Sequence, residues 1–176
     1  KIDVSDQSFA WDSTGKRLLC LGSKGRSSIL KLWEPDLPRR STVLWLPFGY
    51  RTGFAWSPNG REFAVLGMKG ELGEAQVSVW DVERIHPDYQ TFYMHPPNIT
   101  SVVVAWSPDG RRLVSGSVEG ELAVCNARSG TQISTLMMAK DEIKTTSWSP
   151  KTEELLVVSK SGKIQLWSGK KDDPSR

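Results

Sequence analysis

The sequence contains only two histidines, and this scarcity excludes most common metal and acid–base sites. His86 and His95 lie in a proline-containing connection, and no HExxH or CxxC pattern accompanies them. No GxSxG motif supplies an exposed serine nucleophile either. The sequence therefore predicts no catalytic residue, no metal ligand and no cofactor, and we expect a protein that is not an enzyme.

Cysteine is equally scarce. Cys20 and Cys125 are too few for a disulfide framework, and each stands within an apolar, strand-like run. Buried, reduced thiols are typical of a reducing compartment. We therefore expect an intracellular protein, either cytoplasmic or nuclear.

Long apolar runs are absent as well. No run approaches the roughly 20 residues that span a bilayer, and no secretory leader is recognisable. The sequence thus predicts no membrane partner. It begins at Lys1 rather than at a methionine, which leaves open an excised or processed piece of a longer chain.

Charge of one sign is not concentrated anywhere. The formal net charge is +3, and no run of five or six basic residues occurs. A spread of this kind favours an ordinary solvated surface over a nucleic-acid footprint. Nucleic acid is therefore the alternative partner rather than the favoured one.

A sequence unit recurs along the chain. AWSPNGREFAVLG begins at Ala55 and AWSPDGRRLVSGS begins at Ala105. Looser copies begin at Ala10 and Ser147. The tryptophans that align the copies are spaced by 45, 50 and 42 residues, a period typical of a four-stranded unit. They are Trp11, Trp56, Trp106 and Trp148.

Each copy shows the same order of strand and turn signals. A β-rich run ends in the aligned tryptophan, and a tight turn with STG, PNG or PDG follows in three copies. A second apolar run, a glycine-centred turn and a third run come next, and a second tryptophan closes the third run in three copies. Short apolar runs separated by turns predict an all-β, antiparallel fold without helices.

These motifs resemble the WD repeat. VSVWDVE at Val77–Glu83 follows AWSPNG at Ala55–Gly60, and WSPDGRRLVSGSVEGELAV repeats the pattern, so the resemblance covers essentially the whole chain. In the WD40-repeat family each repeat builds one four-stranded blade of a β-propeller. The resemblance therefore implies a propeller of about four antiparallel blades, the last of which lacks its outer strand.

The chain departs from the family's polar tetrad of His, Ser or Thr, Asp and Trp. The aspartate is missing from every turn before the third strand, where Lys24, Lys69, Glu119 and Ser161 stand. His95 fits the histidine position only if PPN is a small insertion. We therefore expect blades that are held together more by packing than by polar networks.

The repeat also predicts how the chain is divided. We expect blades at about 5–46, 51–95, 100–138 and 142–168, together one propeller segment over 1–168, and a polar C-terminal tail at 169–176. A ring of seven or eight blades at this period needs about 300 residues. We therefore expect part of a larger ring, completed by further blades, by a second copy or by a different protein. A closed four-blade ring, and closure of the last blade by KIDV at residues 1–4, stay open.

Binding through loops is the function that the sequence favours. Propeller loops stand on a rigid scaffold, and the connection PFGYR combines aromatic and arginine side chains, which are typical of interface hot spots. We therefore predict a non-catalytic scaffold that binds other proteins or peptides within a multi-subunit complex. The alternative is an RNA- or ribonucleoprotein-associated module that binds through a mildly basic face. The predicted protein-binding residues are Phe48, Tyr50, Arg51, Lys24, Met68, Lys69, Glu119, Lys140 and Lys160.

Overall fold

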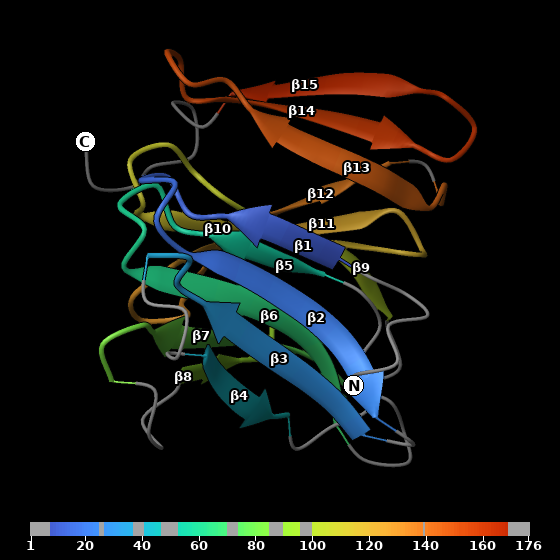
Figure 1. Cartoon of the computed structure of the whole chain (residues 1–176). Helices are drawn as coiled ribbons and strands as arrows, with labels where there is room; N and C mark the ends of the chain where they lie inside the picture. The colour runs from blue at the N-terminus through green and yellow to red at the C-terminus, as the bar shows by residue number, and fades with distance from the viewer. Residues whose placement is uncertain are drawn as a thin grey trace.

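The computed structural model describes residues 8–24, 27–36, 41–46, 53–69, 74–84, 90–95, 100–138 and 140–168. Within these residues the protein consists of antiparallel β-sheets and turns, without helices (Figure 1). The predicted all-β propeller architecture is therefore confirmed. Residues 1–4 and the tail at 169–176, to which the sequence also assigned roles, lie outside the described residues.

Four sheets follow one another along the chain. Sheet 1 contains β1 (Ser8–Trp11), β2 (Leu18–Lys24), β3 (Ser27–Trp33) and β4 (Ser41–Trp45). Sheet 2 contains β5 (Phe54–Trp56), β6 (Glu62–Lys69), β7 (Glu74–Asp81) and β8 (Gln90–Phe92). Sheet 3 contains β9 (Ser101–Trp106), β10 (Arg112–Ser117), β11 (Glu121–Asn126) and β12 (Gln132–Met137). Sheet 4 has three strands in the described residues, β13 (Ile143–Trp148), β14 (Glu154–Ser159) and β15 (Ile164–Ser168).

A short polar side chain closes the first turn of sheets 2 and 3. Ser57 Oγ accepts a hydrogen bond from the Glu62 amide at 2.9 Å and donates one to Asn59 Oδ1 at 2.7 Å. Ser107 Oγ likewise accepts a hydrogen bond from the Arg112 amide at 2.9 Å. These bonds satisfy amides that the tight turn leaves without a strand partner, which explains why serine recurs after the aligned tryptophan.

Each sheet has two chemically different faces, because side chains alternate along a strand. One face carries the aligned tryptophan, and we call it the tryptophan face. The other carries the residue before that tryptophan and mainly aliphatic neighbours, and we call it the aliphatic face. In sheet 1, for example, Trp11 pairs with Leu18 on one face, and Ala10 pairs with Leu19 on the other.

The tryptophan face of each later sheet packs on the aliphatic face of the sheet before it. Between sheets 1 and 2, Phe63 is fully buried and lies between Trp56 and Trp80, with ring centroids 5.6 and 6.3 Å apart. These rings cover Leu19 and Leu32 of sheet 1. The other two junctions have cores of the same construction, so one packing solution is used three times along the chain.

An indole hydrogen bond also repeats between sheets. Trp56 Nε1 donates to the carbonyl oxygen of Ala10 at 3.0 Å, and Trp106 Nε1 donates to that of Ala55 at 3.2 Å. Each acceptor immediately precedes the aligned tryptophan of the previous sheet. At the third junction the buried Trp148 Nε1 has no partner in the described part of the chain.

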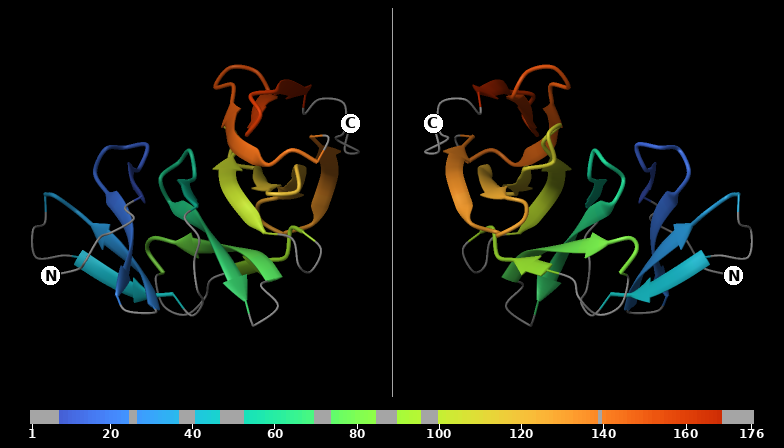
Figure 2. Two further views of the ribbon diagram at one scale, coloured as in Figure 1. Left: turned by 90° about the vertical axis from the view of Figure 1, so that its right-hand side faces the viewer. Right: turned by 90° about the vertical axis from the view of Figure 1, so that its left-hand side faces the viewer.

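The four sheets form an arc rather than a closed ring (Figure 2). Sheets 1 and 4 stand at its two ends, and among the described residues no further sheet packs on the tryptophan face of sheet 1 or on the aliphatic face of sheet 4. The arc has the stacking geometry of a propeller but leaves one side open.

Sheet 3 contains a buried polar network in addition to its packed apolar core. The buried His95 lies with Nδ1 3.2 Å from Glu121 Oε1 and Nε2 3.1 Å from Ser115 Oγ, which donates to Ser101 Oγ at 3.0 Å. His95 thus reaches the serine of the second strand, as the insertion hypothesis required. Glu121 supplies a carboxylate two residues after Glu119, the position where the sequence lacked an aspartate.

His95 predicts a pH-dependent stability. Burial lowers the pKa of His95 below the ordinary value of 6.5, although Glu121 partly opposes this shift. Below pH 6.5 the unfolded chain therefore binds a proton that the folded protein excludes, and the free energy of unfolding falls with pH by at most about 1.4 kcal/mol per unit. Urea unfolding from pH 7.5 to 5.5 measures this slope. In a His86→Gln background the additional His95→Gln change should flatten it, and an unchanged slope contradicts the assignment.

Candidate protein-interaction surfaces

The turns of the sheets lie on two opposite edges of the arc, because successive turns of an antiparallel sheet alternate between its ends. The first-turn face carries the turns at residues 12–17, 57–62, 107–112 and 149–154. The second-turn face carries the turns between second and third strands and the connections between sheets. Of the predicted binding residues, those with a described backbone lie on the second-turn face: Lys24, Met68, Lys69, Glu119, Lys140 and Lys160.

Three of the predicted binding residues are described with their side chains, and all three are exposed. Glu119 and Lys140 flank a close contact in which Gly120 of sheet 3 lies against the backbone of Asp141. Lys160 Nζ lies 2.7 Å from Glu142 Oε2. The structure therefore brings these three residues to one surface above sheets 3 and 4.

The charges on this surface are partly compensated. A hydrogen bond from Lys160 to Glu142 raises the pKa of the lysine, which therefore stays protonated at neutral pH. Hydrogen bonds from Ser159 and Ser161 lower the pKa of Asp141, which therefore stays ionised. Because cations and carboxylates alternate here, the described part of this face is not a uniformly basic surface, and polar peptide groups suit it better than a run of phosphates.

The remaining predicted residues are described incompletely. Lys24 ends β2, and Met68 and Lys69 end β6, so their backbones lie at the second-turn face, but their side chains are outside the described residues. Phe48, Tyr50 and Arg51 lie wholly outside the described residues. Their role in binding stays a prediction.

A groove of about 280 Å³ lies on the first-turn face between sheets 3 and 4. Arg112 and Glu153 face each other across it, with Nη2 and Oε2 3.5 Å apart. None of the residues that line this groove is among the predicted binding residues. Its lining residues are Ser107, Pro108, Asp109, Arg112, Trp148, Pro150, Lys151, Thr152 and Glu153.

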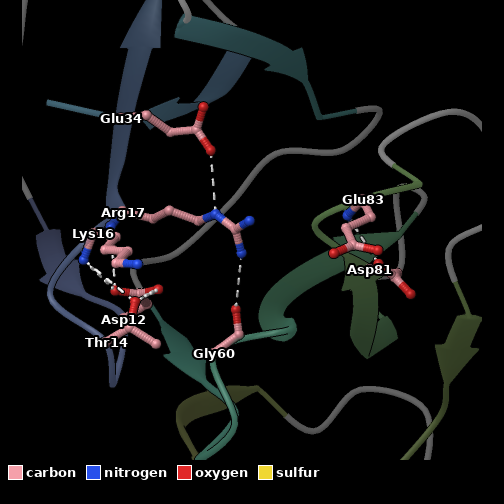
Figure 3. Close-up of polar contacts among 8 residues, drawn as sticks. All are labelled: Asp12, Thr14, Lys16, Arg17, Glu34, Gly60, Asp81 and Glu83. Carbon is pink, nitrogen blue, oxygen red and sulfur yellow. Dashed lines mark hydrogen bonds and ion pairs between the residues drawn. The ribbon is translucent and has the colours of Figure 1, made fainter. Parts of the chain in front are cut away.

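Asp12 and Arg17 organise the first-turn face at the opposite end of the arc (Figure 3). Asp12 Oδ1 accepts hydrogen bonds from the amides of Lys16 and Arg17 at 3.0 and 3.2 Å. Burial alone would raise the pKa of Asp12, but these bonds and one from Thr14 Oγ1 lower it below the ordinary value. The Asp12 carboxylate therefore stays ionised and stabilises the turn at residues 12–17 through these hydrogen bonds.

Arg17 connects sheets 1 and 2. Its Nε lies 3.2 Å from Glu34 Oε1, and its Nη1 donates to the Gly60 carbonyl at 3.4 Å (Figure 3). We expect Arg17→Ala to lower the free energy of unfolding by about 1 kcal/mol, because a partly buried charged hydrogen bond is lost. The matched control, Arg61→Ala, breaks an exposed pair with Asp81 and should cost less than about 0.5 kcal/mol. Equal losses in urea unfolding contradict the bridging role.

The two thiols and the acidic side chains of the described residues were compared with the requirements of nucleophiles and metal sites. Burial raises the pKa of Cys125 to about 12 and also raises that of Cys20, so both thiols stay protonated at neutral pH and are poor nucleophiles. The described ranges contain no group of three histidine, cysteine or acidic side chains placed to hold a metal ion. Within the same ranges, no helix has the length and apolar character required to cross a bilayer.

The two ends of the arc expose large apolar side chains. Phe9 is 65% exposed and Trp11 is 48% exposed on the tryptophan face of sheet 1. Leu166 is 60% exposed and Ile164 is 69% exposed on sheet 4. Monomeric proteins rarely expose contiguous apolar surfaces of this kind without using them for binding.

Comparisons with known proteins agree with this architecture. A sequence model described as the anaphase-promoting complex subunit 4 WD40 domain matches residues 77–151. The WD repeat-containing protein 91 homolog of Dictyostelium discoideum is 22% identical over 165 residues, which cover 92% of this chain and 20% of that protein. Protein HIRA of Caenorhabditis elegans is 26% identical over 140 residues, covering 65% of this chain and 15% of that protein.

A solved structure shows the same fold. The β-propeller domain of Cps50 (Swd1) from Myceliophteria thermophila superposes with a TM-score of 0.74 at 20% identity. The match covers 95% of this chain and 56% of that one. This chain therefore spans about half of the solved propeller and a fifth or less of these curated relatives.

Proposed function

We propose, on the premise that this chain is a divergent WD40-repeat β-propeller, that it is a non-catalytic scaffold that binds other proteins within a multi-subunit complex. The observation that carries the proposal is the apolar surface exposed at both ends of the arc, at Phe9, Trp11, Ile164 and Leu166. Exposure of such apolar surfaces to water is unfavourable, and packing against another polypeptide sheet would bury them.

The partners of the scaffold are of two kinds in this proposal. The first covers the arc ends and completes the ring, and is either a second copy of this chain or further propeller blades. The second binds the loops of the second-turn face through Phe48, Tyr50, Arg51 and their neighbours. The rigid sheets need little reordering when a partner binds, which favours recognition through the loops that they carry.

Several findings support protein rather than RNA as the second kind of partner. The cations Lys140 and Lys160 stand among Glu119, Asp141 and Glu142 on the second-turn face, so its described part lacks the basic surface that phosphate contacts require. An RNA-associated role remains the alternative, and it is favoured only by the net charge of +3. An intracellular location, cytoplasmic or nuclear, belongs to the same proposal and is supported by the two cysteines, which form no disulfide in the described part of the chain.

Affinity capture combined with RNA binding tests the proposal. The 176-residue chain and its Tyr50→Ala variant each serve as bait for capturing proteins. The amount of each captured protein is then compared between the wild type and the variant. We expect Tyr50→Ala to lose at least one protein about tenfold or more, whereas Lys151→Ala on the first-turn face retains it. Tight, steeply salt-dependent binding of single-stranded RNA that is lost in Lys24→Ala/Lys69→Ala would instead favour the alternative.

A further inference from the structure

The first turn of sheet 4 departs from those of sheets 2 and 3, and the groove on the first-turn face lies beside it. In sheets 2 and 3 the residue two positions after the turn serine is Asn59 or Asp109. The Oδ1 atom of each accepts hydrogen bonds from the serine hydroxyl and from the amide two residues later. Lys151 stands at the same position in sheet 4, and a lysine has no acceptor atom with which to close the turn in this way.

Trp148, which lines the groove, contains a buried hydrogen-bond donor without an acceptor. Trp56 and Trp106 each donate an indole hydrogen bond to the previous sheet, whereas Trp148 Nε1 has no partner in the described residues. The Trp148 ring instead lies edge-to-face with Trp167, with ring centroids 5.8 Å apart. A buried N–H without an acceptor is unfavourable, so an acceptor supplied by a molecule in the groove would be favoured.

The Trp148 ring has room to present this donor to the groove. Protein atoms cover Nε1, so a ligand reaches it only when the ring turns towards the groove. Trp148 is half-buried and borders the open volume of about 280 Å³, whereas Trp106 is 7% exposed at the preceding junction. We therefore expect binding in the groove to move the Trp148 indole and to change the environment of its N–H.

The size and lining of the groove favour a stretch of polypeptide. Its volume of about 280 Å³ lies just below the roughly 300–1,000 Å³ of small-molecule pockets, and much of its rim is exposed. Pro108, Pro150 and the Trp148 ring provide apolar surfaces of the kind that proline-rich segments bind in the polyproline II conformation. A chain in this conformation has no internal hydrogen bonds, so its carbonyl groups can accept one from an indole N–H.

The charges on the two walls of the groove favour a peptide with side chains of opposite charge on either side of its proline. Asp109 on the sheet 3 wall and Lys151 on the sheet 4 wall are both exposed. Burial alone would raise the pKa of Asp109, but hydrogen bonds from Ser107 and from the Arg111 amide lower it, so the carboxylate stays ionised at neutral pH. A basic side chain is thus attracted to one wall and an acidic side chain to the other. The carboxylates of Asp109 and Glu153 disfavour the phosphates of a nucleic acid.

We propose that this groove binds an extended, proline-containing segment of a partner protein, with a basic side chain against Asp109 and an acidic side chain against Lys151. The segment crosses the groove with proline against the Trp148 ring, and one of its carbonyl oxygens accepts a hydrogen bond from Trp148 Nε1. This inference rests on the proposed scaffold function, because it names a further class of partner. The site lies on the first-turn face and uses neither the arc ends nor the second-turn loops.

Calorimetric titration of the 176-residue chain with synthetic peptides tests the site. The probes have a Pro-Pro-Ala-Pro core with arginine on one side and glutamate on the other. Both orders of the two charges are titrated, because a polyproline II segment can cross a groove in either direction, and the tighter-binding order is used for the variants. We expect this peptide to bind at least about tenfold more tightly than the same peptide with alanine in place of each proline.

Two charge-neutralising variants test the contacts with the walls. Asp109→Asn removes the charge but keeps the acceptor, as Asn59 does in the equivalent turn, so it should fold normally. Asp109→Asn and Lys151→Gln should each weaken binding about threefold, and the loss should disappear when glutamine replaces the matching charge of the peptide. Lys16→Gln is the matched control, because Lys16 is exposed on the first-turn face of sheet 1, and it should bind as the wild type does.

The indole N–H of Trp148 provides a readout that binding elsewhere would not move. In heteronuclear NMR spectra its resonance, identified by its absence in Trp148→Phe, should shift during the titration, whereas that of Trp56 should not. Trp148→Phe retains an aromatic ring but loses the donor, so we expect it to bind the peptide about fivefold more weakly. Far-ultraviolet circular dichroism checks that this variant folds, and the two charge variants test the site independently of it.

Several results would overturn the proposal: no binding of either peptide order, binding without a shift of the Trp148 N–H, or charge losses that persist with the glutamine-substituted peptides. Binding of a single-stranded oligonucleotide that is lost in Trp148→Phe would assign the groove to nucleic acid and would overturn it as well. Failure of the peptides to bind would leave intact the capture of proteins through Tyr50. A chain that captures no protein would remove the scaffold function even if the peptides bind, so the two failures are distinguishable.

Discussion

Phe63→Ala is expected to lower the free energy of unfolding by about 4 kcal/mol. Phe63 is fully buried between Trp56 and Trp80 and belongs to the core that joins sheets 1 and 2. Its removal leaves a cavity bounded by two rigid indoles, which cannot collapse into it easily. Urea unfolding followed by tryptophan fluorescence measures the loss.

The matched control truncates an apolar residue that the structure leaves exposed. Met137→Ala should change the free energy of unfolding by less than about 0.5 kcal/mol, because Met137 is 54% exposed on β12. A loss below about 1.5 kcal/mol for Phe63→Ala would show that sheets 1 and 2 do not share a close-packed junction.

Gly120→Ala is expected to lower the free energy of unfolding by about 3 kcal/mol. Gly120 has a φ of +83°, which disfavours any side chain by about 1 kcal/mol. An added Cβ would also lie 2.7 and 2.8 Å from the backbone oxygen and nitrogen of Asp141. Backbone atoms cannot yield as a flexible side chain does, so the contact between sheet 3 and the following connection must open.

Gly162 provides a matched control in the next sheet. It occupies the same turn with a φ of +86°, but a Cβ there meets no atom within 4 Å. Gly162→Ala should therefore cost only the backbone term of about 1 kcal/mol. If thermal and urea unfolding give equal losses for the two variants, the close approach of Gly120 to Asp141 is not present in solution.

Much of the fold could be predicted because the repeat determines both the spacing of the sheets along the chain and the side of each strand on which the aligned tryptophan lies. Trp11, Trp56, Trp106 and Trp148 each end the first strand of a sheet, as their shared sequence context predicts. The three strands that sheet 4 has in the described residues also agree with the sequence, since residues 169–176 are polar. Alternation within these strands then determines which residues are buried between sheets.

Side-chain networks were harder to predict, because they depend on small shifts of register. The Glu121 carboxylate stands two residues beyond the position where the family's aspartate is expected, yet it meets His95 from 26 residues away. From the sequence, His95 fits the histidine position of the tetrad only if PPN is a small insertion, and the length of this connection alone does not show whether it is one. The groove beside Trp148 depends on two turns about 40 residues apart, and no local pattern reports such a contact.

The central claim is that one tryptophan face and one aliphatic face are left uncovered at the ends of a four-sheet arc. Hydroxyl-radical footprinting of the Leu166→Glu variant tests it directly, because oxidation of each tryptophan reports its exposure. The account predicts strong labelling of Trp11 and Trp33 and protection of Trp80, Trp106 and Trp167, which are at most 7% exposed. Protection of Trp11 and Trp33 to the same degree as the buried indoles, or labelling of all five alike, would contradict it.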